Sequence, residues 1–471
     1  MQTKVKKKSD FTPIEKKWIM YDVGNSAFTL LCSVFIPIIV QALCEAEGMS
    51  NTEYQTFWSI VTSVITLAVA IISPIVGTFA DTDGMKKPLF LASALVGIVG
   101  CVLLGMPLPL AGFVAVFIIT RMSYNISLVF YDSMLTDVTD MERVDKISSH
   151  GYAWGYIGSC IPFIISIGLY ALSLYDLLNA TVTYIIIFIL NAVWWLCFTL
   201  PLTKSFKQVH YIKRQPQAIR NSFKRLFSVF KDDVPNKKGI LIFLIAFFLY
   251  IDGVYTVIDL ATTYGLALGI DQIQLVLALL LTQIIAFPCA IISGILAKKY
   301  DNGKLIIAFI TGYLGIAIFA IWLTQAWQFW FLAVCVGLLQ GGVQALSRSY
   351  FAKIIPVNKS GEFFGIMDIF GKGASFVGTM LVAIVTAATD NSNYGVIPIS
   401  CLIGVGLVVF IIGYLEIRKY ERKHGKIALM ADGSATVTIT DCENQSEAAV
   451  ADETQTAVAD DSAESGQGDE Q

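Results

Sequence analysis

Charged and polar side chains interrupt several long apolar segments of this sequence, and these side chains are the ones most able to do chemistry. An Asp, Lys or Arg near the centre of a membrane-spanning helix costs on the order of 2.5–3.5 kcal/mol during insertion, so it needs a partner or a water-filled cavity. Most spacings within a segment are 3, 4, 7 or 11 residues, which places each set on one helix face. We therefore expect a polar pathway for a substrate or protons, with side chains that only fix helix packing as the alternative. The pathway set consists of Asp22, Asn25, Ser26, Arg121, Asn125, Asp132, Asp252, Asp259, Gln340 and Gln344.

The four aspartates of this set can bind a proton, an amine or another cation. A carboxylate in surroundings of low dielectric constant is disfavoured in its charged form, so proton coupling is one expected use. Arg121 differs because a guanidinium keeps its charge. It could hold a carboxylate or phosphate of the substrate, or it could neutralise Asp132 on the same helix face. The sequence leaves both roles open.

A second pair of opposite charges lies near the C-terminal end of the apolar region. Asp368 and Lys372 are four residues apart, with the acid first, which is the favourable order on a helix. The pair could simply neutralise itself. Alternatively, it could exchange partners when a gate opens.

Motifs of enzymes do not occur in the chain. There are only three histidines, and the sequence contains neither HExxH nor GxSxG. The phosphate-binding motif GxxxxGK[ST] does not occur either. We expect no enzymatic activity, no cofactor and no metal, and we expect ion or solute gradients to supply the energy.

The composition predicts that the elements carrying these residues are membrane helices. Hydrophobic residues make up 55% of the 471 residues and charged ones 15%, with a mean hydropathy of +0.67. Soluble domains contain about 25% charged residues, so a soluble multidomain protein is excluded. A spanning helix needs about 20 largely apolar residues. Twelve such segments are expected, near 17–44, 55–80, 88–106, 111–135, 148–172, 181–202, 239–264, 273–297, 305–324, 328–353, 361–387 and 395–416.

The distribution of Lys and Arg predicts the orientation of these helices. The six connections at 45–54, 107–111, 172–181, 265–272 and, further along, 325–328 and 388–394 contain no Lys or Arg. Apart from Arg121 and Lys372, the basic residues lie in the termini, in the opposite loops or at nearby helix ends. Because basic loops stay in the cytoplasm during insertion, both termini are expected to be cytoplasmic.

The expected organisation is an all-α integral membrane protein with two six-helix halves. Residues 1–16 form a cytoplasmic segment, 17–202 the first bundle, and 203–238 a basic loop suited to anionic lipid headgroups. Residues 239–418 form the second bundle, and 419–471 a cytoplasmic tail that is acidic and expected to be disordered from about 427. Membrane lipids and a small solute are the expected partners, without nucleic acid, and a monomer is expected to suffice.

Short motifs in this chain resemble those of a known family. GTFADTDGMKK at 77–87 is similar to the signature cytoplasmic loop of the major facilitator superfamily. YDVGNSAF at 21–28, FLYIDG at 248–253 and ALSRSYF at 345–351 look like motifs of its vacuole-effluxer-like branch, as do EFFG and FGK within 362–372. The resemblance implies the twelve-helix facilitator fold and secondary transport. Fungal members of this branch are linked to release of amino acids from the vacuole.

The same resemblance implies a gate. Asp81 is expected to cap and lock the cytoplasmic end near the eleventh helix. Three departures from the family pattern, Asp132, Ile251 and Asp368 where Asn is common, together with the unexpected Arg121, prevent carrying over a substrate. The expected gating set consists of Gly77, Asp81, Gly84, Lys86, Lys87, Arg348, Asp368 and Lys372.

The leading hypothesis is a gradient-driven, multi-pass transporter for a small polar solute, such as an amino acid or related zwitterion, in a bacterial cell membrane. Arg121 would meet an acidic group of the solute, and an aspartate would meet an amine or a proton. Efflux of amphipathic compounds is the alternative within transport. A non-transporting sensor is the alternative from another class.

Overall fold

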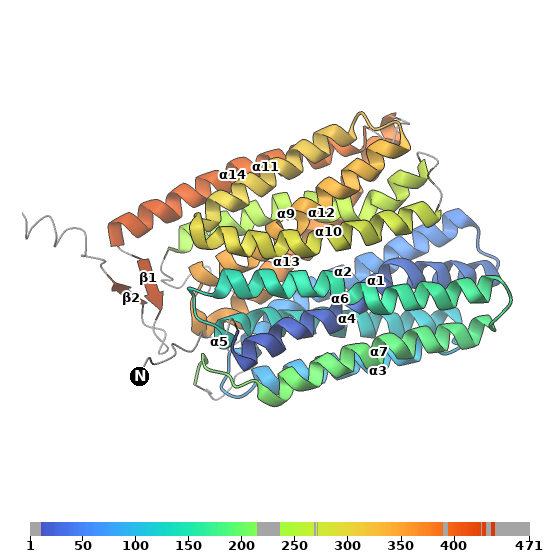
Figure 1. The fold of residues 1–471 in the computed structure, drawn as a ribbon, viewed down its shortest axis with the longest axis horizontal. Coiled ribbons are helices and arrows are strands. Elements are labelled where there is room, and N and C mark those ends of the chain that lie inside the picture. The colour runs from blue at the N-terminus through green and yellow to red at the C-terminus, as the bar shows by residue number, and fades with distance from the viewer. Residues whose placement is uncertain are drawn as a thin grey trace, which may run out of the picture.

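The computed structural model describes residues 11–213, 236–267, 270, 272–389, 394–424, 426–429 and 435–438. Long helices run side by side along the long axis of the molecule (Figure 1). The helices from the N-terminal part of the chain lie in the lower half of the view, and most of those from the C-terminal part lie in the upper half (Figure 1). We refer to these two groups of helices as the first and the second half, and the domain bounds expected from the sequence stay predictions.

Seven described helices make up the first half and six the second. The first half contains α1 (Pro13–Ala46), α2 (Asn51–Ala80), α3 (Lys86–Leu104), α4 (Leu110–Ser133), the short α5 (Leu135–Val138), α6 (Val144–Leu174) and α7 (Ala180–Ser205). The second half contains α9 (Lys237–Ala267), α10 (Gln272–Lys299), α11 (Asn302–Ala320), α12 (Ala326–Ile354), α13 (Ser360–Thr389) and α14 (Val396–His424), with a 3-10 turn at Val357–Lys359 before α13.

Eleven helices among the described residues are long and apolar enough to cross a membrane. Helix α13 is 30 residues long, but only Val377–Thr386 within it counts as a shorter apolar stretch. A twelfth crossing by α13 therefore stays a prediction. The start of α1, the far end of α14 and the two strands lie at one end of the bundle, which we call the terminal end (Figure 1).

Helix α1 begins earlier than the expected residue 17, because its first turn carries a strong start signal. The Thr12 side chain accepts from Glu15 N, and the Glu15 carboxylate accepts from Thr12 N, which together form a capping box. Pro13 at the first helical position suits the fixed backbone angle of proline.

The C-terminal tail is not wholly without structure, contrary to the expectation of disorder from about residue 427. Strands β1 (Lys426–Leu429) and β2 (Ala435–Thr438) pair antiparallel, with Lys426 opposite Thr438. The second strand reads Ala-Thr-Val-Thr, and β-branched residues favour strands. An acidic composition therefore did not prevent a local hairpin directly after α14.

Candidate functional site

A buried ion cluster joins the two halves close to the terminal end. Arg348 of α12 is only 3% exposed, and its Nη1 lies 2.9 Å from Asp132 Oδ1 of α4. Its Nη2 lies 3.7 Å from Asp22 Oδ2 of α1. Arg348 also donates to Ser148 of α6, from Nε to Oγ at 2.9 Å and from Nη2 to the carbonyl oxygen at 3.0 Å. We call Asp22, Asp132, Ser148 and Arg348 the arginine clamp.

Aromatic rings enclose the arginine clamp. The guanidinium carbon of Arg348 lies 4.2 Å from the ring centroid of Tyr152 and 4.8 Å from that of Trp18. Cations are attracted to aromatic faces, and more strongly where water is excluded. The Tyr131 hydroxyl donates to Asp22 Oδ2 at 2.9 Å. The guanidinium is thus held by charge and by ring faces, all of them from the first half.

Glycines on α6 allow this close approach. A Cβ on Gly151 would lie 2.8 Å from Asp22 Oδ2 and 3.0 Å from Arg348 Nη2. One turn further on, a Cβ on Gly155 would lie 2.9 Å from Ser26 Oγ. A methyl group at Gly151 would therefore displace the Asp22 carboxylate and crowd the Arg348 guanidinium.

One of the two roles expected for Arg121 is wrong: it does not neutralise Asp132. Asp132 pairs instead with Arg348 from the other half. Arg121 lies 11 residues before Asp132, which is about 16 Å along the helix. Its guanidinium lies 5.4 Å from the Tyr124 ring centroid, and its Nη1 is buried without a hydrogen-bond partner among the described residues.

Asp252 of α9 is a second buried carboxylate, in the second half. It is 0% exposed, and its Oδ1 accepts from Thr256 Oγ1 at 3.2 Å and from Gly378 N of α13 at 3.1 Å. Within the described part of the chain, Oδ2 has no hydrogen-bond partner. The side chains of Asp259 and Lys372 lie outside the described residues.

The polar residues expected on α1, α4 and α12 are mostly buried. Asn25 Nδ2 donates to Asp22 Oδ1 at 3.3 Å, and Asn125 is buried on α4. Gln344 Oε1 accepts from Tyr156 OH of α6 at 2.5 Å, so it joins the halves.

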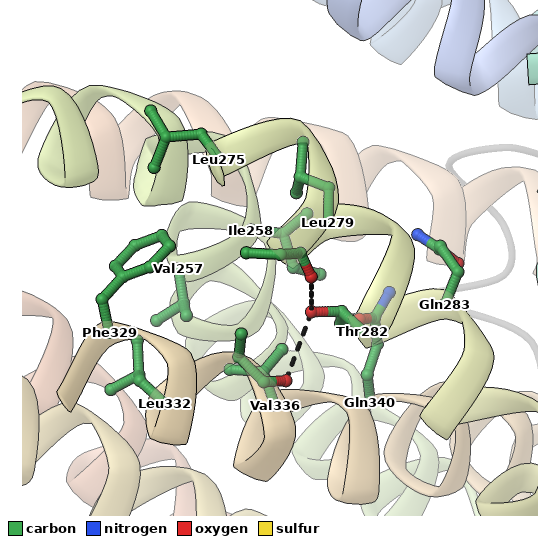
Figure 2. Close-up of a pocket in the computed structure, with 12 residues that line it drawn as sticks. Val257, Ile258, Leu275, Leu279, Thr282, Gln283, Phe329, Leu332, Val336 and Gln340 are labelled. Carbon is green, nitrogen blue, oxygen red and sulfur yellow. Dashed lines mark hydrogen bonds between the residues drawn. The ribbon is translucent and has the colours of Figure 1, made fainter. Parts of the chain in front are cut away.

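A small cavity lies between α9, α10 and α12, with Gln340 in its wall (Figure 2). Its volume is about 40 Å³, and most lining side chains are apolar, Leu275 and Phe329 among them. The Thr282 hydroxyl is already satisfied by two backbone carbonyls, at 2.9 and 3.2 Å, and Gln283 lies beside it (Figure 2). No arginine-clamp residue lines this cavity.

At the terminal end, a carboxylate from the first half caps a helix of the second. Asp81 follows α2, is 0% exposed, and accepts from Gly361 N at 2.7 Å and Glu362 N at 2.8 Å in the first turn of α13. Carboxylates stabilise free N–H groups at a helix N-terminus. Burial raises the pKa of Asp81 to about 7 and outweighs the opposing effects of Lys86 and of the two N–H donors.

Glycines bring α2 and α13 into backbone contact beside this cap. A Cβ on Gly77 would lie 2.1 Å from the carbonyl oxygen of Gly361, a distance that no side chain can occupy. Gly84, in the turn after α2, has φ of +70°, which favours glycine. Further along the same interface, Ser73 Oγ donates to Asp368 Oδ2 at 2.6 Å.

Lys86 lies in a second link between the halves at the terminal end. Its Nζ is 2.7 Å from Asp137 Oδ2 and 3.1 Å from Ser360 Oγ, the first residue of α13. The Lys86 and Asp137 side chains are both fully buried. Lys87 makes no ion pair within the described ranges.

Sequence reasoning missed several residues of these contacts. Asp137 follows the expected end of a helix at 135 and therefore reads as part of a loop, although a buried Lys86 needs an acid at the same end of the bundle. Asp145 of α6 was also missed; its Oδ1 accepts from Asn302 Nδ2 at 2.7 Å, and it pairs with Lys353 of α12. These partners are 51 to 208 residues apart in the sequence, so they carry no local sequence signal.

Comparison with known proteins gives the family. The model of the family described as "Vacuole effluxer Atg22 like" matches residues 14–138 and 136–423. An uncharacterized MFS-type transporter of Bacillus subtilis, YxiO, is 35% identical over 405 residues, which are 85% of this chain and 94% of that protein. Autophagy-related protein 22 of Eremothecium gossypii is 26% identical over 311 residues, or 59% of this chain and 60% of that protein.

Solved structures agree on the fold. The human organic anion transporter MFSD10 gives a TM-score of 0.63 at 14% identity, covering 84% of this chain and 98% of that one. The MFS transporter FucP in its outward conformation gives 0.66 at 12% identity, covering 86% and 98%. The motifs, the two helical halves and these matches lead to one conclusion: the chain is a multi-pass membrane protein of the vacuole effluxer Atg22-like family, within the MFS transporters rather than among enzymes.

Proposed function

We propose that this protein is a proton-coupled secondary transporter of a small polar solute, such as an amino acid or related zwitterion, working by alternating access. The observation that carries the proposal is the arginine clamp, in which Arg348 of one half is held by Asp22 and Asp132 of the other. Removing one partner of a buried pair costs about 3–5 kcal/mol. Such a contact can resist separation of the halves and respond to protonation.

Protonation is the step that would release the clamp. A proton on Asp132 or Asp22 removes one of the negative charges facing Arg348, which weakens its attachment to the first half. The Asp81 cap and the Lys86–Asp137–Ser360 link must also open for the terminal end to separate. With cytoplasmic termini, these contacts hold the halves together on the cytoplasmic side.

The test is uptake of a labelled amino-acid and small-metabolite panel by purified protein in liposomes, with and without an inward proton gradient. We expect gradient-stimulated uptake that falls at least tenfold in Asp132→Asn and in Asp22→Asn. Asp140→Asn, an exposed acid outside the clamp, serves as the matched control and should keep full uptake. Equal uptake with and without the gradient would refute proton coupling.

Efflux of amphipathic compounds is the alternative within transport. A resistance assay against mixed toxic amphiphiles separates the two functions.

The sensor alternative is tested by deleting residues 427–471. A transporter should keep its flux after this deletion, whereas a sensor that relies on the tail should fall silent. We place the protein in a bacterial cell membrane, acting as a monomer.

A further inference from the structure

Arg121 lies on the face of α4 that is turned toward the other half. Its distance of 11 residues from Asp132 corresponds to three helical turns, so the two side chains share a face. Asp132 contacts Arg348 of the second half, which fixes the direction of that face. Arg121 therefore faces the space between the halves, about 16 Å further from the terminal end than the clamp.

Among the described residues, no negative charge balances Arg121. Its Nη1 is buried and has no hydrogen-bond partner in the described part of the chain, and no ion pair involves this residue there. Its neighbours are the Tyr124 ring, with the centroid at 5.4 Å, and the Cys32 thiol of α1. Neither carries a negative charge. A cation at membrane depth without a counter-charge is costly, so an anion bound there gains affinity.

Helix α1 presents a polar stripe to the same region. Asp22, Ser26, Thr29 and Ser33 recur at spacings of four, three and four residues, which is one helix face. Asp22 is buried in the clamp, Ser26 and Thr29 are half-buried, and Ser33 is exposed. The Thr29 and Tyr124 hydroxyls lie 2.6 Å apart and connect this stripe to α4. Access thus increases from the clamp toward the end opposite the termini.

We propose that Arg121 is the binding site for the carboxylate of the transported solute, so that the substrates are small organic carboxylates, zwitterions included. A guanidinium matches a carboxylate through two parallel N–H···O bonds. One unbalanced cation among neutral hydroxyls fits a group with a single negative charge better than a phosphate ester with nearly two. The inference rests on the proposed transport function and names the class of its solute.

The separation of the two sites gives them distinct tasks. The solute carboxylate meets Arg121, whereas the proton meets the arginine clamp about three turns away. Because the two ligands occupy different groups, they can be bound together, as symport requires.

The experiment uses the purified full-length protein and three matched probe pairs: lactate and lactamide, alanine and alaninamide, succinate and succinamide. A ligand that binds only the folded state raises the melting temperature, and the stabilisation grows with the logarithm of one plus the ratio of ligand concentration to Kd. We expect at least one carboxylate, and not its amide, to raise the melting temperature at 20 mM. The apparent Kd should weaken at least tenfold in Arg121→Gln and less in Arg121→Lys.

Arg418→Gln is the matched control, because Arg418 is a half-buried arginine paired with Asp301 at the terminal end. It should bind the carboxylate as the wild type does. If Arg121→Gln does not fold, Arg121→Lys together with the carboxylate–amide comparison in the wild type still decides the matter. The proposal is overturned if acid and amide give equal shifts, or if the shift persists in Arg121→Gln. It is also overturned if a shift appears only with glycerol 3-phosphate, added as a phosphate-ester probe, or with no carboxylate of the panel.

Two results separate the carboxylate site from proton-coupled transport. Gradient-driven uptake that survives in Arg121→Gln would reject the carboxylate site and keep proton-coupled transport. Carboxylate binding that depends on Arg121, without gradient-driven uptake, would keep the site and reject coupling. In both cases Arg418→Gln, which lies outside both sites, should bind the carboxylate as the wild type does.

Discussion

Substitution of Arg348 should remove the most contacts of the arginine clamp. Its guanidinium has two carboxylates, a hydroxyl, a carbonyl oxygen and three aromatic rings around it, all supplied by helices of the other half. Lysine has a point charge and no planar fork, so it can satisfy only part of this set.

We expect Arg348→Leu to destabilise the protein by about 3–5 kcal/mol, because Asp22 and Asp132 are left without their cation. The stability of Arg348→Lys should lie between those of the wild type and Arg348→Leu. The midpoint of thermal unfolding in detergent is the measurement, with Arg418→Gln as the control for loss of an arginine outside the clamp. A Leu variant as stable as the wild type would mean that the clamp contributes nothing to the association of the halves.

The raised pKa of Asp81 predicts that opening of the terminal end depends on pH. Burial raises its pKa to about 7 in the closed terminal end, whereas an exposed aspartate has a pKa near 3.8. The closed state binds the Asp81 proton more tightly than an open one does. Protonated Asp81 therefore stabilises the closed terminal end fully below pH 3.8, and this stabilisation is lost as pH rises through about 7. The Asp81 contribution alone should favour an open terminal end at pH 8 relative to pH 6, opposite in sign to protonation of the arginine clamp, and the difference between the wild type and Asp81→Asn isolates it. Asp81→Asn should remove most of this shift.

The distance between spin labels at the terminal ends of α2 and α13 reports that population. The charged groups nearest the Asp81 carboxylate are Lys86 and Glu362, so a Lys86→Gln variant tests how far they contribute. A pH shift unchanged in Asp81→Asn would assign it to another group.

At this scale, the sequence identified the charged residues but not their pairings. Asp22, Asp132 and Arg348 stand out because charge in apolar helices is costly. That Asp132 pairs with Arg348 rather than with Arg121 depends on how two helices 216 residues apart in sequence pack. Spacing along one helix cannot supply that information.

Helix α6 shows how a single element positions the clamp. It packs against α1 of its own half and against α10 and α12 of the other half, and Gly151 is where it comes closest to Asp22 and Arg348. By contrast, a Cβ added at its exposed Gly168 would have no atom within 4 Å.

This helix offers a matched pair of substitutions. Gly151→Ala should lower the melting temperature and reduce transport at least tenfold, since the methyl group would lie 2.8 Å from Asp22 Oδ2. Gly168→Ala should be neutral or stabilise by up to about 1 kcal/mol through better helix propensity. Similar effects of the two substitutions would show that space at Gly151 is not required.

Helix boundaries were predicted less well than helix existence. The early start of α1 follows from Thr12 and Glu15, which an apolar-window reading ignores. Helix α6 likewise begins at Val144, because polar residues such as Asp145 find partners across the halves. Polar helix ends buried by tertiary contacts look like loops in a hydropathy profile.

For the whole molecule, the one-sided distribution of Lys and Arg predicts cytoplasmic termini. A fluorescent reporter fused after residue 471 should mature, since it folds in the cytoplasm, whereas alkaline phosphatase fused there should stay inactive. The same phosphatase fused within 172–181 should be active. The reverse pattern would place the closed terminal end on the outer side of the membrane.

The links between the halves also constrain how the protein is made. Arg348 is synthesised 216 residues after Asp132, which at roughly 5–20 residues per second is a delay of about 10–40 s. During that interval the first half has already entered the membrane with two acids and no cation beside them. Membrane insertion must therefore tolerate an incomplete bundle, whose bare carboxylates offer quality-control proteases and chaperones a means to distinguish unfinished chains from finished ones.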